Sequence, residues 1–337
     1  MQTATPARTP ERLDQNGNHV WAIVLAGGEG VRLRPLVRHI CGDERPKQYV
    51  PLLDSRTLLR QTVDRAARLV PPERTVVVTI QDHATYVANE LQAGPSFQIL
   101  VQPEARGTAA GVLFPAHWIH AQDPDAVVVV FPSDHYIQEE ALFVGHLADV
   151  VGFVGRHPDR IVLVGAQPTD AETEYGWIEP GERVGWLATT PVYQIREFRE
   201  KPSPEVARTL FASGSLWNTM IFGGRADALI EAGRQCLPLL HERLARLPAF
   251  LSTEHEPWAI RHAYSLAPTA NFSRAILQAC PENLVVSKVP GLTWCDLGTP
   301  ERVVRTVTAM GIAPPWLEQV TTDPVATRVP ELLPGRL

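Results

Sequence analysis

Short apolar runs of strand length alternate along the chain with longer segments in which apolar residues recur every three or four positions. The run "VWAIVLA" (20–26) contains no polar side chain, as expected for a strand whose two faces are both covered. "TLLRQTVDRAARLV" (57–70) instead places its apolar residues along one face of a helix. The alternation predicts further strands at 74–80, 97–102, 125–135 and 160–166, and further helices at 84–92, 142–157 and 107–122, the last interrupted or kinked near Pro115.

Strand followed by helix, repeated at this rhythm, predicts a doubly wound, mostly parallel α/β sheet. Ligands of such sheets bind beyond the carboxyl ends of the strands, where loops lead into helices. Two polar segments, "AGGEGVRL" (26–33) and "PSDH" (132–135), fall at such ends. The second half is more mixed, with strands expected at 192–202 and 216–224 and a helix at 204–214. Because no repeat or linker separates the halves, we expect them to share one core.

The composition narrows the class of protein. A chain of 337 residues, 45% hydrophobic and 20% charged, is typical of a soluble globular protein with a sizeable core. Its net charge of −6 argues against a general nucleic-acid binder. No apolar run reaches the roughly 18–20 residues needed to cross a bilayer, and the polar N-terminus does not look like a secretory signal. We therefore expect a cytoplasmic protein with neither nucleic acid nor membrane as partner.

Three parts of the chain carry simpler expectations. Residues 1–18 are polar and are expected to be disordered, and the Pro-rich segment 311–337 is expected to be an extended or loose tail. The cysteines lie far apart without a C-x-x-C pair, so we expect reduced thiols at all four positions: Cys41, Cys236, Cys280 and Cys295.

The segment "IVLAGGEGVRLRPL" (23–36) carries three glycines and then Arg32. Glycines let backbone N–H groups approach an anion closely, and a guanidinium can hold two phosphate oxygens at once. The segment is therefore either a tight strand-to-helix turn or a phosphate-binding loop. It is not the G-x-G-x-x-G fingerprint, because Leu33 stands where the last glycine should be, and the chain has no G-K-[ST]. A dinucleotide-dependent oxidoreductase and a P-loop are excluded.

Three charged residues could serve phosphate chemistry. Lys47, in "ERPKQYVPLL" (44–53), is either a solvated lysine or a cation placed to stabilise negative charge developing on phosphorus. Asp134 lies at the end of an apolar strand and is either a helix N-cap or a Mg²⁺ ligand. Asp296, in "TWCDLGTPERVV" (293–304), is either a turn residue or the second carboxylate of that metal site.

Other polar residues leave two interpretations open. Glu200 and Lys201 adjoin on an expected strand, so only one of them can face a given cleft unless the strand ends there. Asn218 stands in an apolar segment, and its amide needs either a sugar hydroxyl or the backbone as partner. His117 and His120 lack the further ligands of a zinc site, and no motif offers a nucleophile for covalent catalysis.

Seven segments, in chain order, resemble motifs of the sugar-1-phosphate nucleotidyltransferases, most closely of the mannose-1-phosphate guanylyltransferases. The glycine segment resembles that family's G-G-x-G-x-R-L signature, "RPKQYVPL" its P-K-Q segment and "FPSDHYI" its P-S-D-H. "QPEARGTAAGV" occupies the place of its base-recognition stretch, and "ETEYGWIE", "EFREKP" and "WCDLGTPE" are similar to Y-G-Y-I-E, F-x-E-K-P and W-x-D-x-G. Val31, Arg34 and Met220 differ from the family's usual residues, and Met220 stands where it could crowd the sugar pocket.

The resemblance implies a Rossmann-like, GT-A-like core and a reaction without a covalent intermediate, in which a sugar 1-phosphate attacks the α-phosphorus of an NTP and pyrophosphate leaves. It implies that Arg32, Lys47 and Asp134 are catalytic and that Asp134 and Asp296 hold Mg²⁺. The sugar phosphate would be bound by Gly176, Glu200, Lys201 and Asn218. The nucleotide would be bound by Ala26, Gly27, Gly28, Gly30, Arg32, Gln102, Gly107, Thr108, Ser133 and Asp134.

The resemblance also implies GTP and α-D-mannose 1-phosphate as substrates and GDP-mannose as product. Thymidylyl- or uridylyl-transfer to glucose 1-phosphate, and a catalytically silent relative that binds a nucleotide sugar and regulates a partner, stay open as alternatives. The nucleotidyltransferase domain is expected at 19–310, with a nucleotide-binding half (19–166) and a sugar-phosphate-binding half (167–310). We expect no isomerase or β-helical domain after it, and the oligomeric state is left open, a homodimer included.

Overall fold

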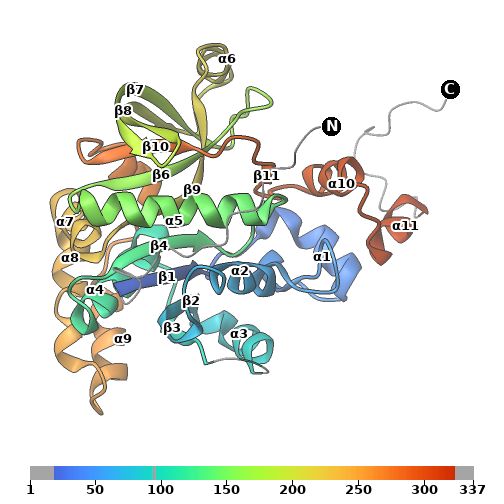
Figure 1. Ribbon diagram of the computed structural model, residues 1–337. Coiled ribbons are helices and arrows are strands. Elements are labelled where there is room, and N and C mark those ends of the chain that lie inside the picture. Colours follow the sequence, from blue (N-terminus) through green and yellow to red (C-terminus); the bar gives the residue numbers. More distant parts are fainter. Residues whose placement is uncertain (1–18, 93, 95, 323–337) are drawn as a thin grey trace, which may run out of the picture.

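The first half of the chain forms the parallel part of a larger sheet. The computed structural model describes residues 19–92, 94 and 96–322, and Figure 1 shows helices on both faces of the sheet. The strand β1 (Val20–Leu25) lies between β2 (Thr75–Ile80) and β4 (Val127–Pro132), and β3 (Gln98–Gln102) forms the edge beside β2. The predicted alternation is confirmed by the helices α2 (Leu58–Ala66), α3 (Ala84–Leu91) and α4 (Gly107–Gln122), whereas the first helix, α1 (Arg34–Cys41), was not predicted.

Strand β1 is buried on both faces, which explains its unbroken apolar sequence. Ala22 and Val24 belong to a core cluster shared with α2 and with α5 (Glu140–Arg156). Trp21 and Ile23 belong to a second cluster, on the other face, shared with α4. Alternate side chains of a strand point to opposite faces, so neither face of β1 can carry polar residues.

The second half of the sheet is mixed, as expected. Its strand order continues from β4 through β9 (Leu216–Arg225), β6 (Ile161–Ala166), β10 (Leu284–Lys288) and β8 (Thr190–Glu200) to β7 (Gly176–Leu187). β6 and β10 are parallel, whereas β9 runs antiparallel to both β4 and β6. Both halves of the chain therefore contribute to one nine-stranded sheet.

The remaining elements surround this sheet. A short antiparallel ribbon pairs β5 (Tyr136–Ile137) with β11 (Trp294–Cys295). The later helices are α6 (Pro204–Ala212), α7 (Ala226–Cys236), α8 (Pro238–Leu244), α9 (Glu256–Leu266), α10 (Pro300–Ala309) and α11 (Pro315–Thr322). Single helical turns are η2 (Val31–Leu33), η3 (Lys47–Tyr49), η4 (Pro72–Arg74), η5 (Gln81–His83), η6 (Leu247–Phe250) and the π-helical η7 (Ser273–Leu277).

Two helices differ from the sequence-based expectation. α4 is not interrupted at Pro115, because most of its length is buried against the sheet and α7, and that packing holds the helix together around the proline. An extended tail is wrong for residues 315–322, which form α11. Trp316 of that helix is buried, and its indole nitrogen donates to the Leu52 carbonyl oxygen at 3.0 Å. Residues 1–18 and 323–337 lie outside the described residues.

The expectation of four reduced cysteines is also wrong. Cys236, at the end of α7, forms a disulfide with Cys280, just before β10, and their Cα atoms lie 6.7 Å apart. The fold brings together two residues that are 44 positions apart, a proximity that their spacing in the sequence does not reveal. Cys41 and Cys295 are free thiols.

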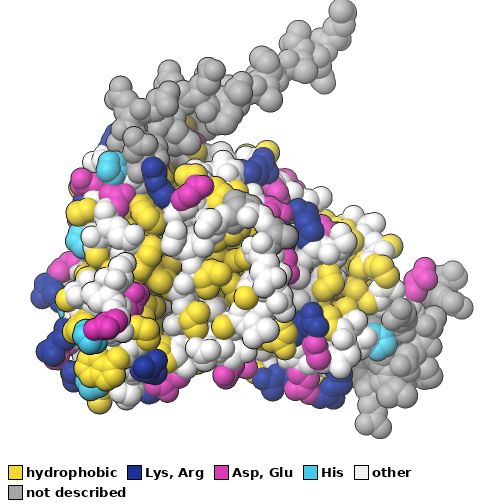
Figure 2. Space-filling view, turned by 90° about the horizontal axis from the view of Figure 1, so that it is seen from below, with side chains coloured by type: hydrophobic (Ala, Val, Ile, Leu, Met, Phe, Trp, Pro, Cys, Tyr) yellow, Lys and Arg dark blue, Asp and Glu magenta, His cyan; other side chains and the backbone are white. Residues whose placement is uncertain are grey.

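The surface seen from below mixes the two signs of charge. In Figure 2, Lys and Arg side chains stand next to Asp and Glu around a centre of apolar and uncharged groups. Such interspersed charges form local ion pairs rather than a one-sign field. None of the described helices is both long and apolar enough to span a membrane.

Candidate active site

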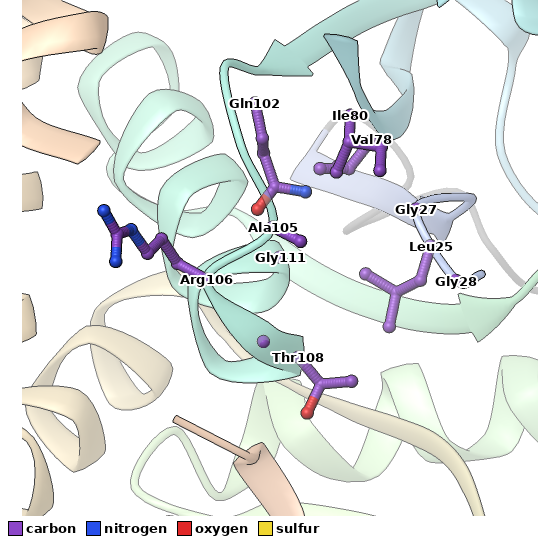
Figure 3. Close-up of a pocket in the computed structure, with 11 residues that line it drawn as sticks. Leu25, Gly27, Gly28, Val78, Ile80, Gln102, Ala105, Arg106, Thr108 and Gly111 are labelled. Atoms are coloured by element: carbon purple, nitrogen blue, oxygen red, sulfur yellow. The ribbon is translucent and has the colours of Figure 1, made fainter. Parts of the chain in front are cut away.

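A cavity of about 200 Å³ lies at the carboxyl ends of the first three strands. Its lining residues are Leu25, Gly27, Gly28, Val78, Ile80, Gln102, Ala105, Arg106, Gly107, Thr108 and Gly111. Figure 3 shows the side chains of Gln102, Ile80 and Leu25 turned toward a common space, whereas the Arg106 side chain points away from it. A mostly apolar cavity with a few polar groups is typical of a site for a small organic molecule.

The glycine loop after β1 is held by the segment around η3. The Gln48 amide nitrogen donates to the carbonyl oxygens of Ala26 at 3.1 Å and Gly28 at 2.8 Å, and the Tyr49 hydroxyl donates to that of Ala26 at 2.7 Å. The C=O and N–H of one peptide unit point in opposite directions, so these contacts turn the N–H groups of the following residues the other way. Gly30 closes the loop against Lys47, whose backbone nitrogen lies 3.0 Å from the position of an added Cβ.

Gln102 has its amide fixed within the cavity. The Tyr264 hydroxyl donates to Gln102 Oε1 at 3.1 Å, and Gln102 Nε2 donates to the Thr79 carbonyl at 3.4 Å. Nε2 is also the atom that lies 3.6 Å from an added Cβ at Gly27 and 3.9 Å from one at Gly111. The amide therefore presents a donor, rather than an acceptor, to the space between those two glycines.

The start of α4 is fixed against the chain between α9 and η7. Gly107 has φ +79°, and a Cβ added there would lie 2.2 Å from the Ala270 carbonyl oxygen, so the position requires glycine. The Thr108 hydroxyl accepts from the Phe272 backbone nitrogen at 2.8 Å. Just after β4, the buried Ser133 hydroxyl donates to the Leu25 carbonyl oxygen at 2.7 Å. This hydrogen bond ties the end of β4 to the end of β1.

Lys47 brings together the charged residues that the sequence singled out. Its ammonium nitrogen lies 3.2 Å from Asp134 Oδ2 and donates to the main-chain oxygen of Asp296. A longer contact of 3.4 Å reaches the main-chain oxygen of Leu297. The lysine side chain is only 9% exposed, so these contacts are made away from bulk water. Lys47, Asp134 and Asp296 therefore meet at one point beside the glycine loop.

Asp296 lies within a buried network of polar groups. Its Oδ1 accepts from the Tyr175 hydroxyl at 2.7 Å, from Arg302 Nη1 at 2.6 Å and from the Gly298 backbone nitrogen at 3.0 Å. The other guanidinium nitrogen of Arg302 binds Glu172, so this arginine bridges two carboxylates. The Arg302 guanidinium also lies over the Tyr175 ring, 4.8 Å from its centroid.

The surroundings of Asp296 keep it ionised. Burial alone would raise the pKa of its carboxyl, but the charges of Arg302 and Lys47, with the hydrogen bond from Tyr175, lower that pKa below its usual value. Burial and the Asp296 charge raise the pKa of the Tyr175 hydroxyl, which therefore stays a donor. Asp296 is held as a carboxylate.

Gly176, Glu200 and Asn218 come together in the second half. Gly176 and Glu200 are paired residues of β7 and β8, and a Cβ added to Gly176 would lie 2.8 Å from Glu200 Oε2 and 3.3 Å from Asn218 Cβ. The side-chain oxygen Oδ1 of Asn218 accepts from the Met220 backbone nitrogen at 3.1 Å. The Asn218 amide therefore has a backbone partner, one of the two alternatives that the sequence left open. The Met220 sulfur accepts from the Ser273 hydroxyl at 3.0 Å. Burial raises the pKa of the Glu200 carboxyl, although Lys201 and Arg274 oppose the shift.

Lys201 stands just beyond the end of β8 and adopts φ +50°. The regular alternation of a strand therefore stops at Glu200, and Lys201 need not point to the opposite face. Its ammonium nitrogen lies 3.3 Å from Glu174 Oε2, and the same oxygen lies 3.1 Å from Arg32 Nη1. Glu174 thus links a cation of the glycine loop to a cation of the second half.

The described residues contain no cluster of three or more His, Cys, Asp or Glu side chains that could hold a metal ion by themselves. Lys47 contacts the carboxylate of Asp134 and the main-chain oxygen of Asp296, which places both aspartates beside one lysine. Carboxylate oxygens suit Mg²⁺, which takes one or two protein carboxylates and completes its shell with phosphate oxygens and water. The donor set therefore fits Mg²⁺ brought in with a phosphate-bearing substrate.

Sequence reasoning missed several residues of this site. Gln48 is part of the P-K-Q segment, so its place in that motif could have indicated its role in holding the glycine loop. Glu174 and Tyr175 stand beside Gly176, which was singled out. Tyr264 and Arg302 carried no local signal, because their partners Gln102 and Asp296 are identified only by the fold.

Known proteins resemble the chain over most of its length. The family model described as nucleotidyl transferase matches residues 21–310. Mannose-1-phosphate guanylyltransferase 2 of Escherichia coli O157:H7 is 32% identical over 287 residues, which are 82% of this chain and 58% of that protein. The xanthan biosynthesis protein XanB of Xanthomonas campestris pv. campestris (strain ATCC 33913) is 31% identical over 83% of this chain and 58% of its own length. The chain thus spans less than two thirds of the curated relatives it matches.

A solved structure supports the same assignment. The protein described as mannose-1-phosphate geranyltransferase from Thermus thermophilus is 30% identical, with a TM-score of 0.74, over 86% of this chain and 79% of that one. The predicted fold class and the resemblance drawn from the seven motifs are confirmed by these matches. The chain belongs to the nucleotidyl transferase family.

Proposed function

We propose that the protein transfers a nucleotidyl group from GTP to α-D-mannose 1-phosphate, forming GDP-mannose and pyrophosphate, with Mg²⁺ as cofactor. The observation that carries this proposal is the meeting of Lys47, Asp134 and Asp296 beside the glycine loop. Transfer at phosphorus requires positioning and charge neutralisation more than a protein nucleophile. Relatives named mannose-1-phosphate guanylyltransferase support the choice of substrates.

The residues of the first half would bind the nucleotide. The base enters the cavity beside Gln102, Gly107 and Thr108, and the phosphates lie along the N–H groups of the glycine loop with Arg32 beside them. The Gln102 amide presents a donor to this cavity, and guanine carries a carbonyl oxygen at the position where adenine carries an amino group. This feature favours GTP over ATP.

The residues of the second half would bind the sugar phosphate. Glu200 and Asn218 offer polar groups to sugar hydroxyls over Gly176, which leaves room because it has no side chain. Lys201 pairs with the phosphate, whose oxygen attacks the α-phosphorus of the nucleotide in line with the departing pyrophosphate. Lys47, close to the reacting phosphorus, neutralises the charge that develops there.

Asp134 and Asp296 would hold the magnesium ion. When bound, Mg²⁺ neutralises phosphate oxygens and helps to orient them for attack. The chain's own contribution is to hold both carboxylates in place, Asp134 through its ion pair with Lys47 and Asp296 through its hydrogen bonds from Arg302 and Tyr175.

The test is pyrophosphate release measured with GTP, ATP, UTP and dTTP, each combined with mannose 1-phosphate or glucose 1-phosphate in the presence of Mg²⁺. We expect the highest kcat/KM with GTP and mannose 1-phosphate. Preference for UTP or dTTP with glucose 1-phosphate would replace the guanylyltransferase assignment. No turnover with any pair, combined with nucleotide-sugar binding, would point to a silent regulatory relative.

The variant Asp134→Asn tests the site within the same assay. We expect it to abolish turnover while leaving the fold intact. Asp159→Asn is the matched control, because Asp159 is exposed in the loop before β6, at the amino end of that strand, whereas the site lies at the carboxyl ends of β1, β2 and β3. Unchanged kcat in Asp134→Asn would overturn the metal assignment.

A further inference from the structure

Glu174 lies between the two cations that the proposed function assigns to different substrate phosphates. A single oxygen, Oε2, lies 3.1 Å from Arg32 Nη1 and 3.3 Å from Lys201 Nζ. Arg32 follows the glycine loop of the first half, and Lys201 follows β8 of the second half. The carboxylate therefore occupies the position where an oxygen anion would be held by a guanidinium and an ammonium together.

The loop that carries Glu174 is anchored on either side of it. The Glu174 backbone nitrogen donates to Glu172 Oε1 at 2.9 Å, and Arg302 binds the other oxygen of Glu172. On the other side, the Tyr175 carbonyl oxygen accepts from the Lys201 backbone nitrogen at 3.1 Å. The backbone thus keeps Glu174 beside Lys201 even when the side chain changes its rotamer.

The Glu174 side chain itself is free to exchange partners. It is 46% exposed, and the side chains of Arg32 and Lys201 are 50% and 46% exposed. Ion pairs as exposed as these are weak and easily broken, so a phosphate with more charge and more oxygens can displace the carboxylate. Binding of substrate phosphate and the two contacts of Glu174 are then mutually exclusive.

We propose that Glu174 is an internal competitor for the phosphate groups of the substrates: it neutralises Arg32 and Lys201 in the empty site, and weakens phosphate binding when substrates enter or products leave. This inference rests on the proposed function for the assignment of both cations to phosphate. It makes Glu174 a residue that sets affinity rather than one that takes part in the chemical step.

The test is equilibrium binding of inorganic pyrophosphate and of mannose 1-phosphate to the full chain, measured by calorimetry without turnover. We expect Glu174→Gln, which keeps the shape and removes the charge, to bind at least one of these anions about two- to tenfold more tightly than the wild type, as the loss of one or two exposed pairs allows. Glu182→Gln is the matched control, six residues beyond Gly176 along β7 and exposed, and should bind as the wild type does.

A second variant locates the effect. In a Lys201→Met background, the change Glu174→Gln should improve anion binding less than it does in the wild type, because one of its two competing contacts is already gone. Equal or weaker binding of both anions by Glu174→Gln, including no measurable binding by either protein, overturns the inference. Tighter binding without turnover of any nucleotide pair would instead overturn the proposed function and leave the competitor role standing.

Discussion

Replacing Arg302 with methionine should destabilise the protein more strongly than other changes on α10. The Arg302 side chain is 9% exposed and bridges Asp296 and Glu172, so the variant leaves two carboxylates without their shared cation. Breaking a buried ion pair costs roughly 3–5 kcal/mol. Asp296 keeps its hydrogen bonds from Tyr175 and Gly298 in the variant. We therefore expect the free energy of unfolding to fall by about 3 kcal/mol, the lower end of that range.

The pH dependence of this loss follows from the pKa of Asp296. In the wild type that pKa is lowered, so the carboxylate contributes stability that is present above its ordinary value of 3.8 and is lost as pH falls through the lowered value. Arg302 is the largest of the causes that lower the pKa of Asp296, so without it the carboxyl should take up a proton at a higher pH than in the wild type. The variant should then be destabilised most at neutral pH and less once that carboxyl is protonated. The difference between the two proteins should therefore shrink from pH 7.5 to pH 4.

The assay is urea unfolding followed by tryptophan fluorescence at both pH values. Arg305→Met is the matched control, because Arg305 is exposed on the same helix, and we expect its change to stay within about 0.5 kcal/mol. The reasoning would be refuted if Arg302→Met lowered the free energy of unfolding by less than about 1 kcal/mol at pH 7.5, or by the same amount at both pH values. Removing a buried cation that bridges two carboxylates should destabilise the protein by more than that.

Further changes test other parts of the site. Gly107→Ala forces a Cβ against the Ala270 carbonyl at a positive φ, and should lower the melting temperature and raise the KM for nucleotide; unchanged values of both would contradict the fit at that turn. Tyr264→Phe should raise the KM for GTP about three- to tenfold with little change in kcat, because Gln102 loses the bond that orients its amide. Glu200→Gln should slow turnover yet unfold at a higher temperature than wild type at pH 7.5. The raised pKa of Glu200 means that its folded form is most stable below its ordinary pKa of 4.5 and loses stability as pH rises through the raised value, so the gain should vanish near pH 4.

The sequence predicted the first half of the fold well. Strands buried on both faces are apolar throughout, and helices between them have one apolar face, so the periodicity identified β1 to β4 and the helices α2, α3 and α4, although not the short α1. The resemblance to the family's motifs assigned Lys47 and Asp134 to one site, and the fold does bring these two side chains together.

The remaining features depend on contacts between distant segments. The antiparallel course of β9, the disulfide between Cys236 and Cys280, and the docking of Trp316 have no local pattern that would indicate them. Whether Glu200 and Lys201 can face the same cleft depends on the residue at which β8 ends. The strand ends at Glu200, and a shift of this end by one residue would change the answer. Long-range pairing and element boundaries are the two things that a single sequence specifies least.

Strand β9 hydrogen-bonds to β4 on one side and β6 on the other. Backbone hydrogen bonds between neighbouring strands, with one register shift between β6 and β9, therefore run from the glycine loop's half of the molecule to the half that carries Glu200. Among the described strands, no flexible hinge of the kind found between separate domains interrupts these hydrogen bonds, so the two walls of the site cannot swing as rigid bodies without breaking them. Opening and closing around substrates is then left to the loops at the carboxyl ends of the strands. Ligand-dependent motion should therefore be sought in the amide hydrogen-exchange rates of those loops rather than in changes of the overall size of the molecule.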